Sequence, residues 1–137
     1  MVMADLKGKG PDSEKITTNL GLVDLGHIDL LVQEGFYSNR TDFIRAAIRS
    51  QLDRHNDALK QFVSRRSLEL GLRRYSRLDL EAVRDAGEKL NIQVLGLAVI
   101  APDVSAELAR ATIASLQVLG ALHASEEVKA ALRDRIS

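Results

Sequence analysis

Three polar side chains near the start of the chain have the chemistry needed to recognise DNA bases. They are Lys15, Thr17 and Asn19, and they stand two residues apart. A lysine donates to guanine or to phosphate, an asparagine pairs with adenine through two hydrogen bonds, and a threonine donates, accepts or contacts the thymine methyl group. The same alternation also suits a solvated sheet face, so the elements that position these side chains decide between the two interpretations.

The polar residues belong to a segment with a period of two, residues 15–20, in which Ile16, Thr18 and Leu20 occupy the alternate positions. This alternation predicts a short amphipathic strand. A strand of this length cannot form a sheet alone, so we expect two identical chains to pair their strands antiparallel about a twofold axis. Such a two-stranded ribbon fits the major groove of B-form DNA.

Two helices are expected after the strand. Apolar residues at helical spacing predict the first over about residues 22–34, with Gly35 at its carboxyl end. Asn39 then suits the amino-terminal cap of a second helix, and Asp42 three residues later resembles a capping box. Since no glycine or proline follows before Gly71, we expect the second helix to run for more than 20 residues.

The start of the second helix is the expected phosphate-binding part of the molecule. The first backbone N–H groups of a helix have no helical acceptor and face the positive end of the helix dipole. The predicted phosphate-contacting residues are therefore Asn39, Arg40 and Thr41.

Residues 15–55 resemble the ribbon-helix-helix DNA-binding proteins of the MetJ, Arc and CopG type. The most specific match is Tyr37–Arg49, where a polar cap precedes an acidic residue, an aliphatic residue, arginine and alanine. The resemblance implies an intertwined dimer that inserts its ribbon into DNA. It also implies that Lys15, Thr17 and Asn19 contact the bases, while the backbone around Asn39 to Thr41 binds phosphate.

The second half of the chain contains an internal repeat. Residues 92–96 match residues 116–120 at an offset of 24, and helical patterns follow at 105–115 and 125–136. A weaker third copy begins near residues 70–72. One strand and one helix per repeat predict a leucine-rich-repeat-like stack.

The same offset continues beyond the strands, where it pairs Val104 with Val128 and Leu108 with Leu132. The open ends of so short a stack, with Gln93, Gln117 and neighbouring aliphatic residues, predict association with another copy.

The expected fold class is α+β. We expect a disordered arm over residues 1–14, and a ribbon-helix-helix dimerisation and DNA-binding domain with an extended second helix over 15–67. A small β/α-repeat domain that mediates oligomerisation is expected over 68–137.

Composition narrows the function further. The 137 residues include 19 basic and 19 acidic residues and no cysteine, so any basic surface is local and there is no cysteine-containing zinc site. His27, His55 and His123 lie in separate segments without the spacing of a helical metal pair. We therefore expect no enzyme activity, no cofactor and no metal. A cytoplasmic location without membrane association is expected, since there is no secretory signal or long apolar run.

These features together predict a sequence-specific transcriptional regulator, most simply a repressor, that binds double-stranded DNA. The expected assembly is a homodimer that forms a tetramer or higher oligomer through its repeats. The alternative is an antitoxin-like or scaffold protein whose C-terminal half binds a partner protein. Such tails are usually disordered until the partner is bound.

Overall fold

The computed structural model describes residues 13–137 and divides them into two compact units. The N-terminal unit spans Lys15–Phe62, and the C-terminal unit contains residues 63–137. Most of the predicted arm, residues 1–12 of 1–14, lies outside the described residues. Within the described part of the chain, no helix is both long enough and apolar enough to cross a membrane.

The first helix, α1, confirms the expected one. It spans Leu22–Gln33, and Gly35 follows with a positive φ of 86°. The N–H of Phe36 donates to the carbonyl of Leu31, which satisfies one of the last helical acceptors. Glycine takes this left-handed conformation without the penalty of a Cβ atom, and this explains why the helix ends here.

The second helix is shorter than expected. The helix α2 spans Arg40–Arg54 and a separate helix, α3, spans Asn56–Arg65, so the prediction of one helix of more than 20 residues is wrong. At the break, the N–H of His55 bonds to the carbonyl of Leu52, only three residues back. Histidine, asparagine and aspartate follow one another at 55–57, and all three are weak helix formers.

The predicted strand at residues 15–20 pairs with nothing in the described chain, where these residues are extended and exposed. The expected partner is the same segment of a second chain, which a single chain cannot supply. The antiparallel pairing therefore stays a prediction.

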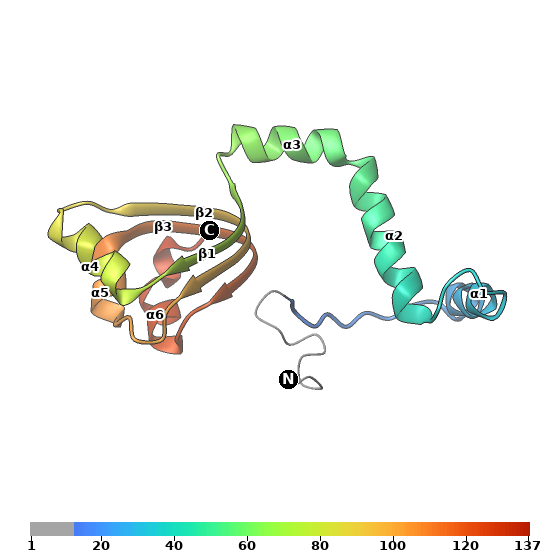
Figure 1. Cartoon of the computed structure of the whole chain (residues 1–137). Helices are drawn as coiled ribbons and strands as arrows, with labels where there is room; N and C mark the ends of the chain where they lie inside the picture. Colours follow the sequence, from blue (N-terminus) through green and yellow to red (C-terminus); the bar gives the residue numbers. More distant parts are fainter. Residues whose placement is uncertain (1–12) are drawn as a thin grey trace. The chain divides into compact units, whose positions relative to one another are not determined.

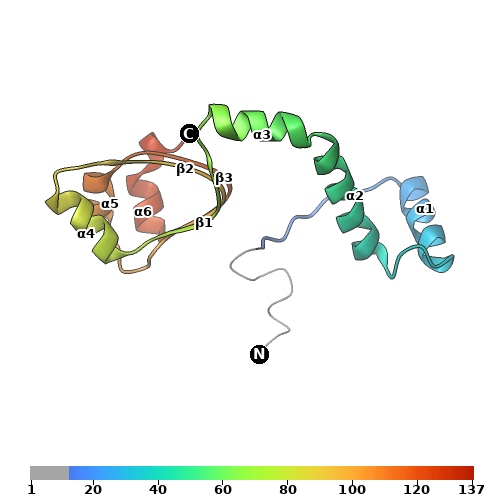
Figure 2. The same cartoon turned by 45° about the horizontal axis from the view of Figure 1, so that its top comes forward.

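The C-terminal unit alternates strands and helices. Its three strands are all parallel and lie in the sheet in chain order. Both cartoon views show the strands curving together around the helices (Figures 1 and 2). The elements are β1 Glu69–Tyr75, α4 Arg77–Asp85, β2 Leu90–Ile100, α5 Ala106–Thr112, β3 Ile113–His123, α6 Glu126–Ala131 and a 3-10 turn at Arg133–Arg135.

The strand register confirms the sequence repeat, including its third copy. Gly71 of β1 pairs with Gly96 of β2, and Gly96 pairs with Gly120 of β3. All three glycines have positive φ, at 106°, 138° and 124°. A Cβ atom at Gly96 would collide with the carbonyl oxygen of Gly71, and one at Gly120 with that of Gly96. The repeated glycine thus allows three backbones to approach closely.

The helices do not follow the offset of the strands. Ser105 and Ser125 cap α5 and α6, each accepting a hydrogen bond from the N–H three residues later, so these helix starts lie only 20 residues apart. The predicted pairing of Val104 with Val128 is therefore wrong, because Val104 precedes the cap and Val128 lies inside α6. The connection from strand to helix shortens after β3, and a constant offset cannot represent that change.

The predicted helices 105–115 and 125–136 are also too long. The strand β3 begins at Ile113, directly after α5, and the end of the chain past α6 turns back to the sheet, where Ser137 donates to the carbonyl of Leu116 at 3.0 Å. β-branched residues at Thr112 and Ile113 favour the change from helix to strand.

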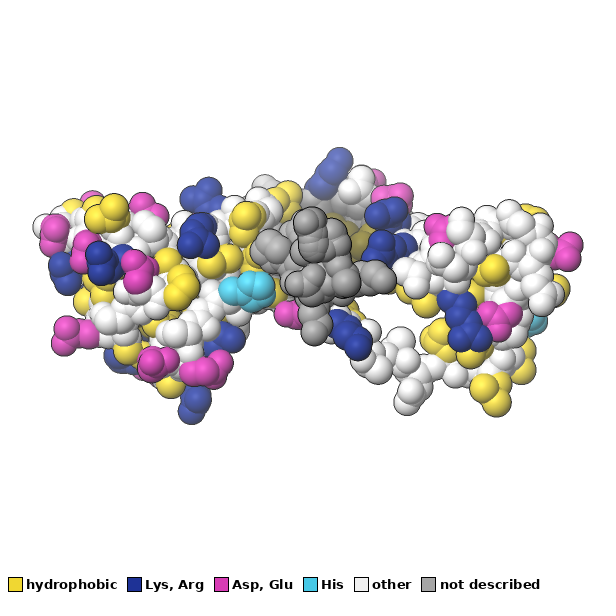
Figure 3. Space-filling view, turned by 60° about the horizontal axis from the view of Figure 1, so that its bottom comes forward, with side chains coloured by type: hydrophobic (Ala, Val, Ile, Leu, Met, Phe, Trp, Pro, Cys, Tyr) yellow, Lys and Arg dark blue, Asp and Glu magenta, His cyan; other side chains and the backbone are white. Residues whose placement is uncertain are grey.

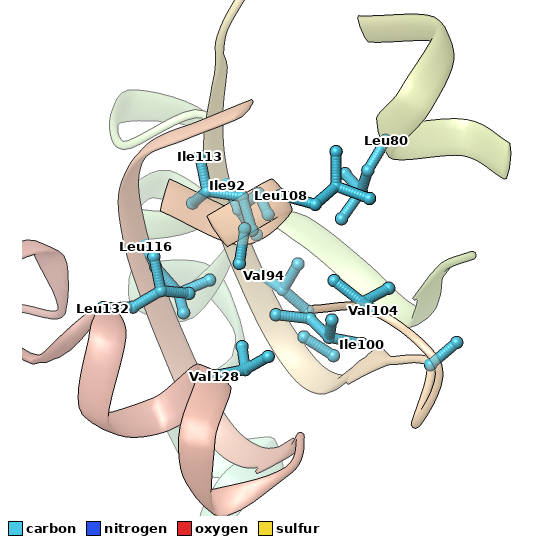
Figure 4. Close-up of a cluster of buried hydrophobic side chains, with 13 residues drawn as sticks. Leu80, Ile92, Val94, Ile100, Val104, Leu108, Ile113, Leu116, Val128 and Leu132 are labelled. Atoms are coloured by element: carbon cyan, nitrogen blue, oxygen red, sulfur yellow. The ribbon is translucent and has the colours of Figure 1, made fainter. Parts of the chain in front are cut away.

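Between the sheet and its helices lies one apolar core. In Figure 4 the labelled side chains from strands and helices point toward one another. The buried members are Leu80, Ile92, Val94, Ala98, Ile100, Ala101, Val104, Leu108, Ala109, Ile113, Leu116, Val128 and Leu132.

Candidate nucleic-acid interface

The segment that carries Lys15, Thr17 and Asn19 is exposed on both of its sides. Its polar residues face solvent, as base-contacting residues must before DNA binds. Its apolar residues are exposed as well, with 85% of Ile16 and 43% of Leu20 accessible. Large apolar side chains in an extended segment without a cover indicate a missing partner.

The helices of the N-terminal unit show the same deficiency. In α1 only Ile28 is buried, and α2 buries no residue. Figure 3 shows many hydrophobic side chains on the accessible surface. Those of α1 and α2 that are exposed are Leu22, Val23, Leu30, Ile44, Ile48 and Leu52. A unit that leaves its helical apolar faces open requires a second chain to complete its core.

The turn between α1 and α2 is held by local contacts. The side chain of Asn39 accepts a hydrogen bond from the N–H of Asp42 at 2.8 Å, which confirms the predicted cap. The Asp42 carboxylate accepts from the N–H of Ser38 at 2.9 Å, one residue before the position that a standard capping box uses. The rings of Tyr37 and Phe43 meet edge to face, with centroids 5.1 Å apart.

The guanidinium of Arg40 is already engaged within the chain. It donates two hydrogen bonds to the carboxylate of Asp29, both at 2.8 Å, and so ties α2 to α1. The hydrogen bond from Arg40 lowers the pKa of Asp29 below its ordinary value, and the same bond raises the pKa of Arg40. Sequence reasoning missed Asp29, although it is the one acidic residue in an apolar run over 28–32.

The backbone at the start of α2 is better placed to meet a phosphate than the Arg40 side chain. The first α-helical hydrogen bond runs from Phe43 to the carbonyl of Asn39. The N–H groups of Arg40 and Thr41 precede it and have no helical acceptor. This arrangement agrees with a phosphate contact through the backbone.

The predicted site residues fall into two groups. Asn39, Arg40 and Thr41 adjoin at the first turn of α2, whereas the three ribbon residues lie on the extended segment before α1. In residues 13–137 no hydrogen bond or ion pair links the two groups. In the expected dimer, both groups would have to face one DNA duplex.

Comparison with known families identifies the class of protein. The ribbon-helix-helix transcriptional regulator family matches residues 11–129, and the chain belongs to this family. No curated protein and no solved structure matches the chain. Members of the family bind DNA and are typically dimers, which agrees with the open apolar faces of the N-terminal unit.

The family match is wider than the resemblance drawn from residues 15–55. It continues through the whole sheet and into α6. The expectation that the C-terminal repeats lie outside the family pattern is therefore wrong.

Proposed function

We propose that the protein is a sequence-specific regulator that reads the major groove with an antiparallel ribbon formed by residues 15–20 of two chains. Lys15, Thr17 and Asn19 face the base edges, while Ile16 and Leu20 face the helices. The exposure of Ile16 and Leu20 in a single chain carries the proposal. A paired ribbon covered by helices from both chains would bury these side chains.

Phosphate binding at the start of α2 complements the ribbon. The N–H groups of Arg40 and Thr41, with the Asn39 side chain nearby, would fix the depth of the ribbon in the groove. The ion pair between Arg40 and Asp29 supports this role indirectly, because it holds the start of α2 against α1.

The C-terminal unit, a leucine-rich-repeat-like stack in this proposal, links dimers on neighbouring DNA sites. Its buried core supports an ordered association domain, in contrast to a tail that folds only on a partner. The protein would act in the cytoplasm as a repressor, by binding and without catalysis. Linked dimers occupy adjacent sites more fully through their effective concentration.

The test compares DNA binding of two variants with the wild type. A DNA site is first selected from random duplexes, and affinity is then measured by fluorescence anisotropy over a salt series. The variant Lys15→Ala/Thr17→Ala/Asn19→Ala should lose at least about tenfold in affinity, since each good base contact contributes ~1–3 kcal/mol of discrimination. Lys60→Ala is the matched control, because it removes one exposed lysine from α3.

The control should bind almost as tightly as the wild type. Sedimentation must show that the triple variant is still dimeric, so that lost binding reports on the ribbon and not on folding. Equal affinity of the triple variant and the control would overturn the assignment of the ribbon as the reading surface.

A further inference from the structure

The two edges of the C-terminal sheet differ in how they are covered. At β3, Ile136 forms a bridge with Leu116, and the N–H of Ser137 donates to the same residue's carbonyl. At the opposite edge, β1 pairs only with β2 among the described residues, and Glu69–Arg74 are all exposed. An uncovered edge strand presents unpaired N–H and C=O groups to which another strand can add.

Side chains of opposite character alternate along this edge. Glu69 and Arg73 pair in register with buried residues of β2, so they lie on the helix side of the sheet. Leu70 and Leu72 lie on the other side and are 66% and 62% exposed. An exposed, uncharged pair of leucines on an open edge is unusual in a soluble domain unless another strand covers it.

The pattern is symmetric about Gly71. The acid and the base stand two residues to either side of this glycine, and the two leucines stand one residue to either side. If a second copy of β1 runs antiparallel and is related by a twofold axis through Gly71, each Glu69 faces an Arg73 and each Leu70 faces a Leu72. Directly opposed residues share one face of the sheet, so charge meets opposite charge and leucine meets leucine.

The curvature of the strand favours the same centre. Gly71 has a φ of 106°, and the strands of this sheet are bent (Figure 2). A bent strand follows an antiparallel copy of itself only when the rotation axis passes through the bend. An axis through Leu72 instead would oppose Leu70 to Arg74 and put the two bends out of step.

The charges are already close enough to take part. Arg73 and Glu69 of one chain lie 3.3 Å apart, and their side chains are about half exposed, at 50% and 49%. Pairing of two copies would bring four alternating charges together, and each arginine would then have two acidic neighbours.

We propose that β1 pairs antiparallel with β1 of a second copy of this chain, centred on Gly71, to form a continuous six-stranded sheet. This inference rests on the association proposed for the C-terminal unit and specifies its surface. The family's dimeric state supplies a second copy at high effective concentration, so even a short strand pairing can be populated.

Disulfide cross-linking of the full chain tests the register directly, because the protein has no cysteine of its own. Copies carrying Leu70→Cys and Leu72→Cys are mixed, left to exchange subunits and oxidised gently. The mixed product should form about tenfold faster than that of Leu119→Cys, because opposed Cβ atoms meet disulfide geometry. Leu119 is a matched control, since it is an exposed leucine on β3.

Charge exchange provides the second measurement, with the same cross-link as its readout. Glu69→Arg gives a chain with arginine at both positions, and Arg73→Glu gives a chain with two acids. Each variant alone should reduce the cross-linking yield, and mixing the two should restore it. A role confined to the ion pair within one chain predicts no restoration, because each chain keeps its like charges.

Cross-linking no faster than that of Leu119→Cys overturns the pairing. Faster linkage of position 70 to itself than to position 72 overturns the register. The ribbon variant Lys15→Ala/Thr17→Ala/Asn19→Ala should cross-link normally, and the charge variants should retain base discrimination on a single DNA site. Failure of this inference is thus distinguishable from failure of the proposed DNA reading.

Discussion

The two units of this chain solve the problem of burying apolar surface in opposite ways. The C-terminal unit covers its sheet with its own helices and completes a core within one chain. The N-terminal unit leaves apolar side chains of α1 and α2 exposed, with Ile28 alone buried in α1. The difference teaches that the first unit depends on association for its stability, whereas the second can fold alone and offers only an edge for association.

The largest expected effect comes from the glycines shared by the three strands. Gly120→Ala should destabilise the C-terminal unit by roughly 2–5 kcal/mol, since it combines a strained positive φ with a clash against the carbonyl of Gly96. Gly71→Ala is the matched variant, with a positive φ but no atom within 4 Å of the new Cβ. It should cost about 1–3 kcal/mol from strain alone. Urea unfolding measures both, and equal losses would rule out backbone crowding.

Core substitutions sharpen the contrast between the units. Leu132→Ala removes a fully buried side chain and should cost about 2–5 kcal/mol at every protein concentration. Ile48→Ala, at a position 54% exposed in one chain, should destabilise the N-terminal unit by dissociating the dimer. Its loss should therefore grow on dilution. Unfolding midpoints at two concentrations give the measurement, and an Ile48→Ala midpoint unaffected by dilution contradicts burial in a dimer.

The smallest expected effect concerns one exposed ion pair in each unit. Arg40 holds the pKa of Asp29 below its ordinary value of 3.8, and Arg110 does the same for Asp134. A lowered folded-state pKa means that each pair stabilises its unit at neutral pH, and that this contribution is lost as acid protonates the carboxylate. Exposure keeps both contributions small.

Asp29→Asn and Asp134→Asn should each lower the unfolding midpoint slightly at neutral pH. Well below pH 3.8 each variant should match the wild type, because the wild-type carboxylate is then protonated too. Thermal unfolding followed by circular dichroism across this pH range measures the difference. A deficit that persists unchanged in acid would assign the effect to packing instead of charge.

Much of the fold could be predicted from the sequence because the signals are local. Asn39 accepts from an N–H three residues away, Gly35 ends α1, and the strand repeat follows a conserved spacing around Gly96 and Gly120. The break at His55 was missed, because weak helix formers leave a smaller signal than glycine or proline. The predicted base-contacting residues remain a prediction from the sequence and the family.

The sequence by itself determined the order of elements, their caps and the family, since these depend on residues close together in the chain. Only the tertiary structure decided that Asp29 holds Arg40, that the helices leave the 24-residue offset, and that β1 is the open edge. These features join segments distant in sequence. Their geometry depends on how sheet and helices pack, and periodicity carries no record of that packing.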